Sequence, residues 1–164
     1  MRQILGIGAL AVIALTACSP SSESGARAAP GSGGNASAIK ACDLLTVEEI
    51  KQATGVVMGA GHLQTTDTQA SCDWSSDDSS GASGVGVIVQ SFDDSLWQTM
   101  AASKHAVAVT GVGEQAFKGV PHSGDLSVKK GQYEVDVGIV DFKHDNATVD
   151  AAALQLMNRV LSRL

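Results

Sequence analysis

The stretch Tyr133-Glu134-Val135-Asp136-Val137-Gly138-Ile139 decides the fold class of this chain. Side chains alternate between the two faces of a β-strand, so the aromatic and aliphatic residues share one face, while Glu134 and Asp136 share the other. Such alternation is typical of an antiparallel strand with one face toward an apolar core and the other toward a polar environment. The stretch therefore predicts an antiparallel sheet that packs its core on one face.

Further strands are expected on the N-terminal side of this stretch. Lys130-Gly131 predicts a tight hairpin turn into it from the preceding strand. The segment 85–92 is the clearest strand of the first half, because three valines alternate along it. In chain order, the expected strands are 56–66, a strand that begins at Ser71, 85–92, 116–120, 125–129 and 132–142.

Three helices are expected between and after these strands. Thr46 and Glu49 have the spacing of a capping box, which predicts a helix that ends before Gly55. A second helix is expected over 93–104, and a third begins at a cap on Asn146 or Thr148. The third helix carries an apolar row for the sheet to bury, made of Val149, Ala153, Leu156, Val160 and Leu164.

The order of these elements indicates the fold class. Strands that follow one another without a helix between each pair favour an α+β fold with an antiparallel sheet. We therefore predict a single domain over residues 39–164, in which a mostly antiparallel sheet of five to six strands packs against two to three helices.

The N-terminus has a different composition. Arg2 precedes a short apolar run that ends in Leu15-Thr16-Ala17-Cys18. This layout is typical of a secretory signal, and the final four residues resemble the lipobox of bacterial lipoproteins. The resemblance implies a signal peptide over 1–17, a lipid-bearing Cys18 as the mature N-terminus, and a membrane-anchored location in the cell envelope, on the extracytoplasmic side. The alternative is a secreted protein that is cleaved elsewhere.

The segment that follows Cys18 is rich in Ser, Gly, Ala and Pro. It has almost nothing to bury, so residues 18–38 are expected to form a flexible tether between the lipid and the domain.

Cys42 and Cys72 are the other two cysteines of the chain. Paired cysteines in an oxidising compartment form disulfides, and a bridge here would close a loop of about thirty residues and stabilise the fold by roughly 3 kcal/mol. The alternatives are a metal-binding pair and a redox dithiol. The C-x-x-C spacing of a redox dithiol is absent, and two thiols alone make a poor zinc site, so we predict the disulfide.

Three motifs together resemble a large group of small bacterial lipoproteins of unknown function that is common in actinobacteria. They are Cys42-Asp43-Leu44-Leu45-Thr46, Ser71-Cys72-Asp73-Trp74 and Gly111-Val112-Gly113-Glu114-Gln115-Ala116-Phe117. The resemblance covers most of residues 41–164. Val47 stands where many members have proline. The group contributes no catalytic residues that could be carried over to this chain.

The sequence argues against several other functions. A net charge of −6 without a basic patch disfavours nucleic-acid binding. The G-x-G-x-x-A match at 111–116 lacks the following helix of a dinucleotide site, and we expect a glycine-bent loop there. The four histidines have no zinc-site spacing, and the acidic pairs Asp77-Asp78 and Asp93-Asp94 do not form a calcium loop. We therefore predict no catalytic residue, no metal and no cofactor.

We are left with two expectations about function. The first is a non-enzymatic binding or accessory role, with an envelope protein or a small apolar ligand as the partner. The second is an envelope hydrolase or metal-dependent enzyme whose site is assembled from residues far apart in sequence. Trp74 and Trp97 are expected to pack in the core in either case.

Overall fold

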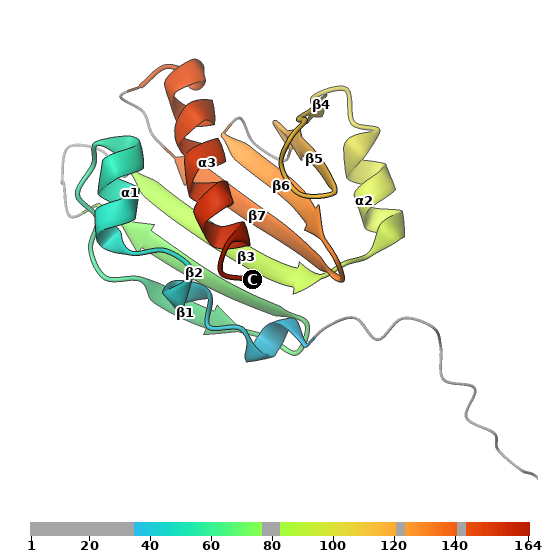
Figure 1. Cartoon of the computed structure of the whole chain (residues 1–164), viewed down its shortest axis with the longest axis horizontal. Helices are drawn as coiled ribbons and strands as arrows, with labels where there is room; N and C mark the ends of the chain where they lie inside the picture. Colours follow the sequence, from blue (N-terminus) through green and yellow to red (C-terminus); the bar gives the residue numbers. More distant parts are fainter. Residues whose placement is uncertain (1–34, 77–82, 121–123, 141–143) are drawn as a thin grey trace, which may run out of the picture. The chain divides into compact units, whose positions relative to one another are not determined.

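The computed structural model of the chain describes residues 35–76, 83–120, 124–140 and 144–164 (Figure 1). Three α-helices are described, α1 (Val47–Thr54), α2 (Asp94–Ala101) and α3 (Asn146–Leu161), together with two short 3-10 helices, η1 (Ala36–Ala38) and η2 (Ala41–Asp43). The strands are β1 (His62–Thr65), β2 (Gln69–Ser75), β3 (Gly84–Ser91), β4 (Val107–Ala108), β5 (Gln115–Lys118), β6 (Asp125–Lys130) and β7 (Tyr133–Val140).

All seven of these strands join one antiparallel sheet in the order β1-β2-β3-β7-β6-β5-β4. The α+β class and the antiparallel sheet are confirmed, but the sheet has seven strands where five to six were expected. The additional strand is β4, at the sheet edge beside β5. Its two residues are too few to show an alternating pattern in the sequence.

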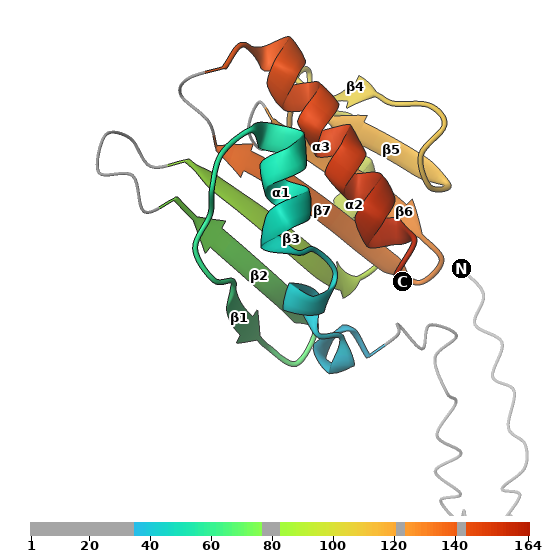
Figure 2. The same cartoon turned by 60° about the vertical axis from the view of Figure 1, so that its left-hand side comes forward.

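The stretch that decided the fold class forms β7, in the middle of the sheet between β3 and β6. Val135, Val137 and Ile139 are buried on the face that α1 and α3 cover. One cross-strand row on this face shows the apolar packing, and it runs Ala70, Val89, Val135, Val128, Ala116. In Figure 2, α1 and α3 lie in front of the sheet and α2 lies behind it. We call the side under α1 and α3 the helix face, and the other side the second face.

Helix α1 begins and ends as predicted. Thr46 accepts a hydrogen bond from the amide of Glu49, and the Glu49 carboxylate accepts one from the amide of Thr46. Gly55 ends the helix with a left-handed φ of 73°, a conformation that costs glycine little because it has no Cβ.

Helix α3 packs its predicted row on the sheet, with two differences. Its cap is Asp145, whose side chain accepts from the amide of Thr148 at 2.8 Å, so the expected caps Asn146 and Thr148 were wrong by a few residues. Leu156 is fully buried, as expected. Leu164 is 37% exposed, because the helix ends at Leu161 and no longer directs later side chains onto the sheet.

Two other elements are shorter than predicted. The strand expected over 56–66 begins only at His62, and the helix expected over 93–104 is α2, with Asp93 as its cap. Before β1, Gly61 passes so close to the sheet that a Cβ there would lie 2.6 Å from the Cys72 sulfur and from Trp74 Nε1. This close approach, rather than strand pairing, explains why a residue without a Cβ occupies position 61.

The structure joins Cys42 of η2 to Cys72 of β2 in a disulfide, in agreement with the pairing expected from the sequence. The bridge holds the segment before α1 against the sheet. Packing reaches back to Ala36, which is buried and lies ahead of the expected domain start at residue 39. Among the described residues, no helix is both long and apolar enough to cross a membrane.

Candidate functional site

The second face of the sheet carries the polar side chains that alternate with the core residues. Strand register arranges them in rows that run from β2 through β3 and β7 to β6. One row is Gln69, Gln90, Glu134 and Lys129, the next is Ser71, Ile88, Asp136 and Ser127, and the third is Asp73, Gly86, Gly138 and Asp125. Residues from four strands therefore meet on one surface.

The third row has no side chains in its centre and an aspartate at each end. A Cβ on Gly86 would lie 3.1 Å from Oδ1 of Asp73, and a Cβ on Gly138 would lie 2.8 Å from Oδ1 of Asp125. Both carboxylates thus lean inward over the glycines. The result is a shallow floor of bare backbone between two acidic walls.

A groove of about 490 Å³ lies over this floor. The apolar side chains that border it include Ile88, Met100, Val120 and Val140, which come from β3, α2, the segment after β5, and β7. Its titratable lining residues, among those the structure describes, are all carboxylic acids: Asp73, Asp125, Glu134 and Asp136.

Glu134 is the most unusual of these acids. It is 1% exposed, and its Oε2 atom is buried without a hydrogen-bond partner. The Gln90 side chain hydrogen-bonds the carboxyl group, but burial outweighs this bond and raises the pKa of Glu134 above its usual range. A buried polar atom without a partner is costly in a folded protein, so this atom is either protonated or awaits a donor.

Asp136 lies one row further along the same face. Burial is the main cause that raises its pKa to about 7, and the charges of Glu134 and Asp125 add to the effect. The Ser127 hydroxyl opposes this shift by donating a hydrogen bond to the carboxylate. Asp136 therefore changes its charge near neutral pH, whereas an ordinary aspartate is fully ionised there.

Helix α2 borders the groove and packs through an aromatic cluster of its own. The Trp97 ring contacts Phe117 with centroids 4.6 Å apart and Phe92 with centroids 5.7 Å apart. Trp97 Nε1 donates to Oε1 of Gln115 at 3.0 Å. Both tryptophans are 2% exposed, as expected, but Trp97 is buried on the second face while Trp74 belongs to the core under α1 and α3.

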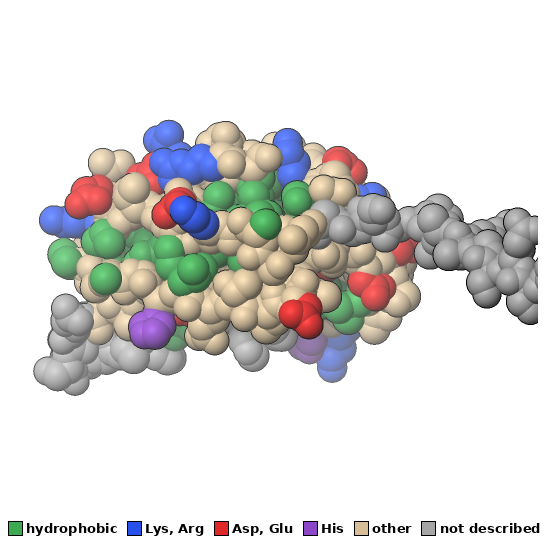
Figure 3. Space-filling model, turned by 90° about the horizontal axis from the view of Figure 1, so that it is seen from below, with side chains coloured by type: hydrophobic (Ala, Val, Ile, Leu, Met, Phe, Trp, Pro, Cys, Tyr) green, Lys and Arg blue, Asp and Glu red, His purple; other side chains and the backbone are tan. Residues whose placement is uncertain are grey.

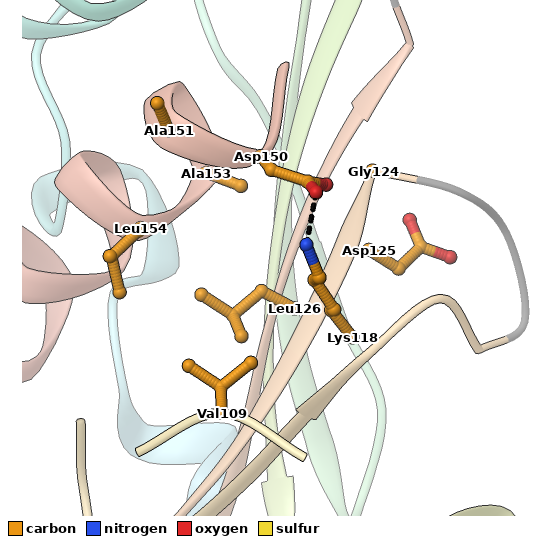
Figure 4. A pocket seen from close by; sticks show the side chains of 9 residues that line it. All are labelled: Val109, Lys118, Gly124, Asp125, Leu126, Asp150, Ala151, Ala153 and Leu154. Atoms are coloured by element: carbon orange, nitrogen blue, oxygen red, sulfur yellow. Dashed lines mark hydrogen bonds and ion pairs between the residues drawn. The ribbon is translucent and has the colours of Figure 1, made fainter. Parts of the chain in front are cut away.

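The helix face has a smaller cavity of about 180 Å³, between α3 and strands β5 and β6 (Figure 4). An ion pair between Lys118 and Asp150 crosses its edge, and Leu126 and Leu154 contribute apolar side chains. The Asp125 side chain points away from this ion pair, in accord with its position on the second face. The small volume and the internally paired charges make this cavity the weaker candidate.

A family comparison agrees with the motifs in the sequence. The model of a family described as "Protein of unknown function (DUF3558)" matches residues 13–143, which is more than half of the chain. The chain belongs to the DUF3558 family. No curated protein and no solved structure matches it. Helix α3 lies beyond the residues that the DUF3558 model matches.

Asp73, Trp74, Glu134 and Asp136 of the sequence motifs line the groove of this DUF3558 chain, whereas the described histidines and the Cys42–Cys72 pair are not among its lining residues. Cys18, Asp77, Asp78 and His122 are outside the described residues. His62 lies on β1, His105 lies after α2, and His144 lies before α3. In the described part of the chain, no group of three or more His, Cys, Asp or Glu residues is arranged to hold a metal ion. The glycines at 111 and 113 form a bent loop that enters β5, as expected, and no helix follows them.

Sequence reasoning missed the groove itself. The alternation in β7 placed Glu134 and Asp136 on the second face, but it gave no sign that this face is partly buried. Asp73 and Asp125 are 52 positions apart in sequence, and only the register of four strands brings them into one row.

Proposed function

We propose that this protein is a lipid-anchored lipoprotein of the cell envelope, and that its domain binds a small ligand in the groove on the second face without acting as an enzyme. The groove is the observation that carries the binding role. Its volume of about 490 Å³ lies within the range of small-molecule sites, which are mostly apolar with a few fixed polar groups. A protein partner on the same face is the other form of a non-enzymatic role.

The proposed anchor rests on the sequence around Cys18, which resembles a lipobox, and on the Ser- and Gly-rich segment that follows it. Lipoprotein anchors with several acyl chains hold a domain stably at a membrane, because a single chain gives only marginal binding. A flexible tether then keeps the domain at high effective concentration near other envelope components. This placement suits a domain that collects or presents a ligand.

Metabolic labelling with an alkyne analogue of palmitate tests the anchor. We expect the wild-type protein to incorporate the label and to fractionate with membranes. Cys18→Ser should lose the label, and should either leave the membrane or keep its uncleaved signal segment. Ser19→Ala is the matched control, because it changes the next residue and keeps the cysteine. Equal labelling of Cys18→Ser and wild type would contradict the lipid anchor.

Filling the floor of the groove tests the binding role. Gly138→Val adds a β-branched side chain, a type that strands accept well, and the nearest atom to its Cβ is the movable carboxylate of Asp125. Mass spectrometry of small molecules that copurify with the full-length protein should find a species bound to the wild type and absent from Gly138→Val. Leu154→Ala is the control, since it alters the helix-face cavity only. An identical set of molecules on the wild type and Gly138→Val would contradict a ligand in this groove.

One observation favours the alternative function of an envelope hydrolase. Asp136 lies in a groove with a pKa raised to about 7, which suits a general acid or base at neutral pH. Assays with chromogenic esters and glycosides test this alternative. Turnover that is lost in Asp136→Asn and kept in Asp67→Asn, an exposed acid outside the groove, would establish the hydrolase and replace the binding role.

A further inference from the structure

We propose that the groove on the second face takes an uncharged ligand, with a hydroxyl group that hydrogen-bonds Glu134 and an apolar body that lies along β3 and β7 over the glycine floor. Glu134 is then the residue that determines the specificity of the groove. The inference rests on the proposed function, because it names the chemical class of the ligand for that same groove.

The first argument is the unpartnered Oε2 atom of Glu134. Strand register places this side chain on the second face, where Glu134 lines the groove and is only 1% exposed. The Gln90 side chain hydrogen-bonds the carboxyl group, but Oε2 has no partner in the described part of the structure. Buried polar atoms nearly always have a hydrogen-bond partner. This atom therefore points to a ligand that supplies the missing bond.

The second argument is that a hydroxyl group completes this bond whether Glu134 is ionised or protonated. Burial raises the pKa of Glu134 above its usual range against the opposing bond from Gln90, so its protonated form is more populated than that of an ordinary glutamate. An ammonium group only donates and serves the ionised form alone, whereas an ether oxygen only accepts and serves the protonated form alone. A hydroxyl group both donates and accepts, so it fits both forms.

The other acids of the groove favour an uncharged ligand. Asp136 already accepts a hydrogen bond from the Ser127 hydroxyl, and Asp125 has an interaction partner of its own. Neither acid therefore calls for a cationic ligand. An anionic ligand is disfavoured as well, because the titratable residues in the described lining are all carboxylic acids and like charges repel.

The third argument is the length and character of the groove. Its lining along β7 runs from Glu134 to Val140, and a strand rises about 3.4 Å per residue, so the groove extends roughly 20 Å. Beyond Glu134 it offers the Ile88 side chain and then bare backbone at Gly86 and Gly138, against which a hydrocarbon body packs. The surface seen in Figure 3 differs, because acidic and basic side chains are interspersed there with apolar ones.

Met100 of α2 provides a reporter for this groove. Because Glu134 is almost completely buried, a ligand must displace a neighbouring group to reach its Oε2 atom. Met100 lines the same groove, and the unbranched methionine side chain adapts readily to new neighbours. Met58 and Met157 are buried in the core under α1 and α3, so their methyl groups serve as internal references.

Three probes that share one apolar body test the inference. They are 4-phenylbutan-1-ol, its methyl ether and 4-phenylbutylamine, which offer a hydroxyl group, an acceptor alone and a cation. Each is titrated into the full-length protein, which is labelled with ¹³C at its methionine methyl groups and extracted from its host membranes in a mild detergent. Binding is followed by the NMR shift of the Met100 methyl group. The free concentration of each probe is measured in the same detergent without protein.

We expect the alcohol to bind about tenfold more tightly than the ether, which corresponds to about 1.4 kcal/mol and is within the range of a single hydrogen bond. The amine should bind no more tightly than the alcohol. Glu134→Met keeps the length of the side chain and removes its carboxyl group, so it should weaken the alcohol about tenfold and change the ether little. Glu134→Gln, whose amide group donates and accepts, should keep most of the affinity for the alcohol. Glu48→Met, the same substitution at an exposed position outside the groove, should change neither.

Other outcomes overturn the inference in ways that can be told apart. If the ether binds as tightly as the alcohol, or if Glu134→Met keeps the preference for the alcohol, the hydroxyl group does not bond Glu134. The proposed function then still stands where Gly138→Val abolishes the Met100 shift. Tighter binding of the amine than of the alcohol also rejects an uncharged ligand.

If no probe shifts the Met100 methyl group, the inference fails, and the copurification experiment decides the proposed function separately. The comparison of the three probes on the wild type needs no substitution. It therefore decides the inference even where Glu134→Met does not fold.

Discussion

Arg163, just after α3, makes a bidentate ion pair with Glu49 of α1 and so holds these two helices together. Its Nη2 atom donates to Oε1 of Glu49 at 2.7 Å and its Nη1 atom to Oε2 at 2.9 Å. Nη1 also donates to the carbonyl oxygen of Leu44 at 2.6 Å, just before α1. The same carboxylate closes the capping box with Thr46, so one side chain both starts α1 and ties it to the end of the chain. Bidentate pairs of this kind are stronger than a single exposed ion pair.

We predict that Glu49→Gln destabilises the domain mainly above pH 4.5. The hydrogen bond from Arg163 is the main cause that lowers the pKa of Glu49 from 4.5 to about 2. A lowered folded-state pKa contributes stability above the unfolded value, and this stability is lost as the pH falls from 4.5 through 2. Both side chains of the pair are partly exposed, and solvent screening weakens such pairs. The free energy of unfolding measured in urea melts should therefore fall by roughly 1–3 kcal/mol.

Glu48→Gln is the matched control for this prediction, because it removes a neighbouring, exposed carboxylate of the same helix. Its effect should stay within about 0.5 kcal/mol, as for other surface substitutions. If the two variants melt alike between pH 5 and 8, the bidentate ion pair does not stabilise the fold.

Leu156→Ala should destabilise the domain strongly. Leu156 is fully buried between α3 and the sheet, and emptying such a leucine position costs roughly 2–5 kcal/mol. Leu154→Ala lies on the same helix but starts from a side chain that is 38% exposed, so it should cost less than about 1 kcal/mol. Thermal melts of both variants check the orientation of α3. Equal losses of stability in the two variants would contradict it.

The Cys42–Cys72 bridge predicts a thiol count and a stability loss. Full-length Cys18→Ser protein, denatured without reductant, should show no free thiol, and the same sample should show two after reduction. Replacing both cysteines by serine should destabilise the domain by roughly 3 kcal/mol, the value for a loop of this length. Two reactive thiols before reduction would rule out the bridge.

Asp136 should make the domain less stable as the pH rises toward neutrality. Its folded-state pKa is raised from 3.8 to about 7, so the stability gained from the protonated form is complete below pH 3.8 and is lost as the pH rises through 7. The loss amounts to at most about 4 kcal/mol. Asp136→Asn should reduce this slope in denaturant melts between pH 4 and 8, while Asp67→Asn should keep it; Glu134, whose pKa is also raised, accounts for any slope that remains. An unchanged slope in Asp136→Asn would place the titration elsewhere.

Local patterns in the sequence were sufficient for several parts of the fold. The capping box of Thr46 and Glu49 and the stop at Gly55 placed α1, because these interactions lie within a few residues of one another. Alternation in β7 placed Val135 and Val137 on the core, and the apolar row of α3 identified the helix that covers them. The two-residue strand β4 and the cap at Asp145 were missed, because short pairings and single caps leave a weak signal among similar residues.

Local patterns in the sequence could not predict the candidate site. Glu134 and Asp136 were assigned to a polar face, and their burial depends on α2, whose Trp97 packs on Phe117 of a distant strand. The inward lean of Asp73 and Asp125 depends on glycines in two other strands. Neither property has a signature in any single segment.

The sequence by itself determined the class of fold, the cysteine pair and the face of β7 that meets the core, because periodicity and capping act over a few residues along the chain. Only the tertiary structure decided that four carboxylates share one groove, and that Glu134 leaves an oxygen atom unpartnered there. The physical reason is that strand register joins residues far apart in sequence, and burial shifts their pKa values only after the sheet and α2 have enclosed them.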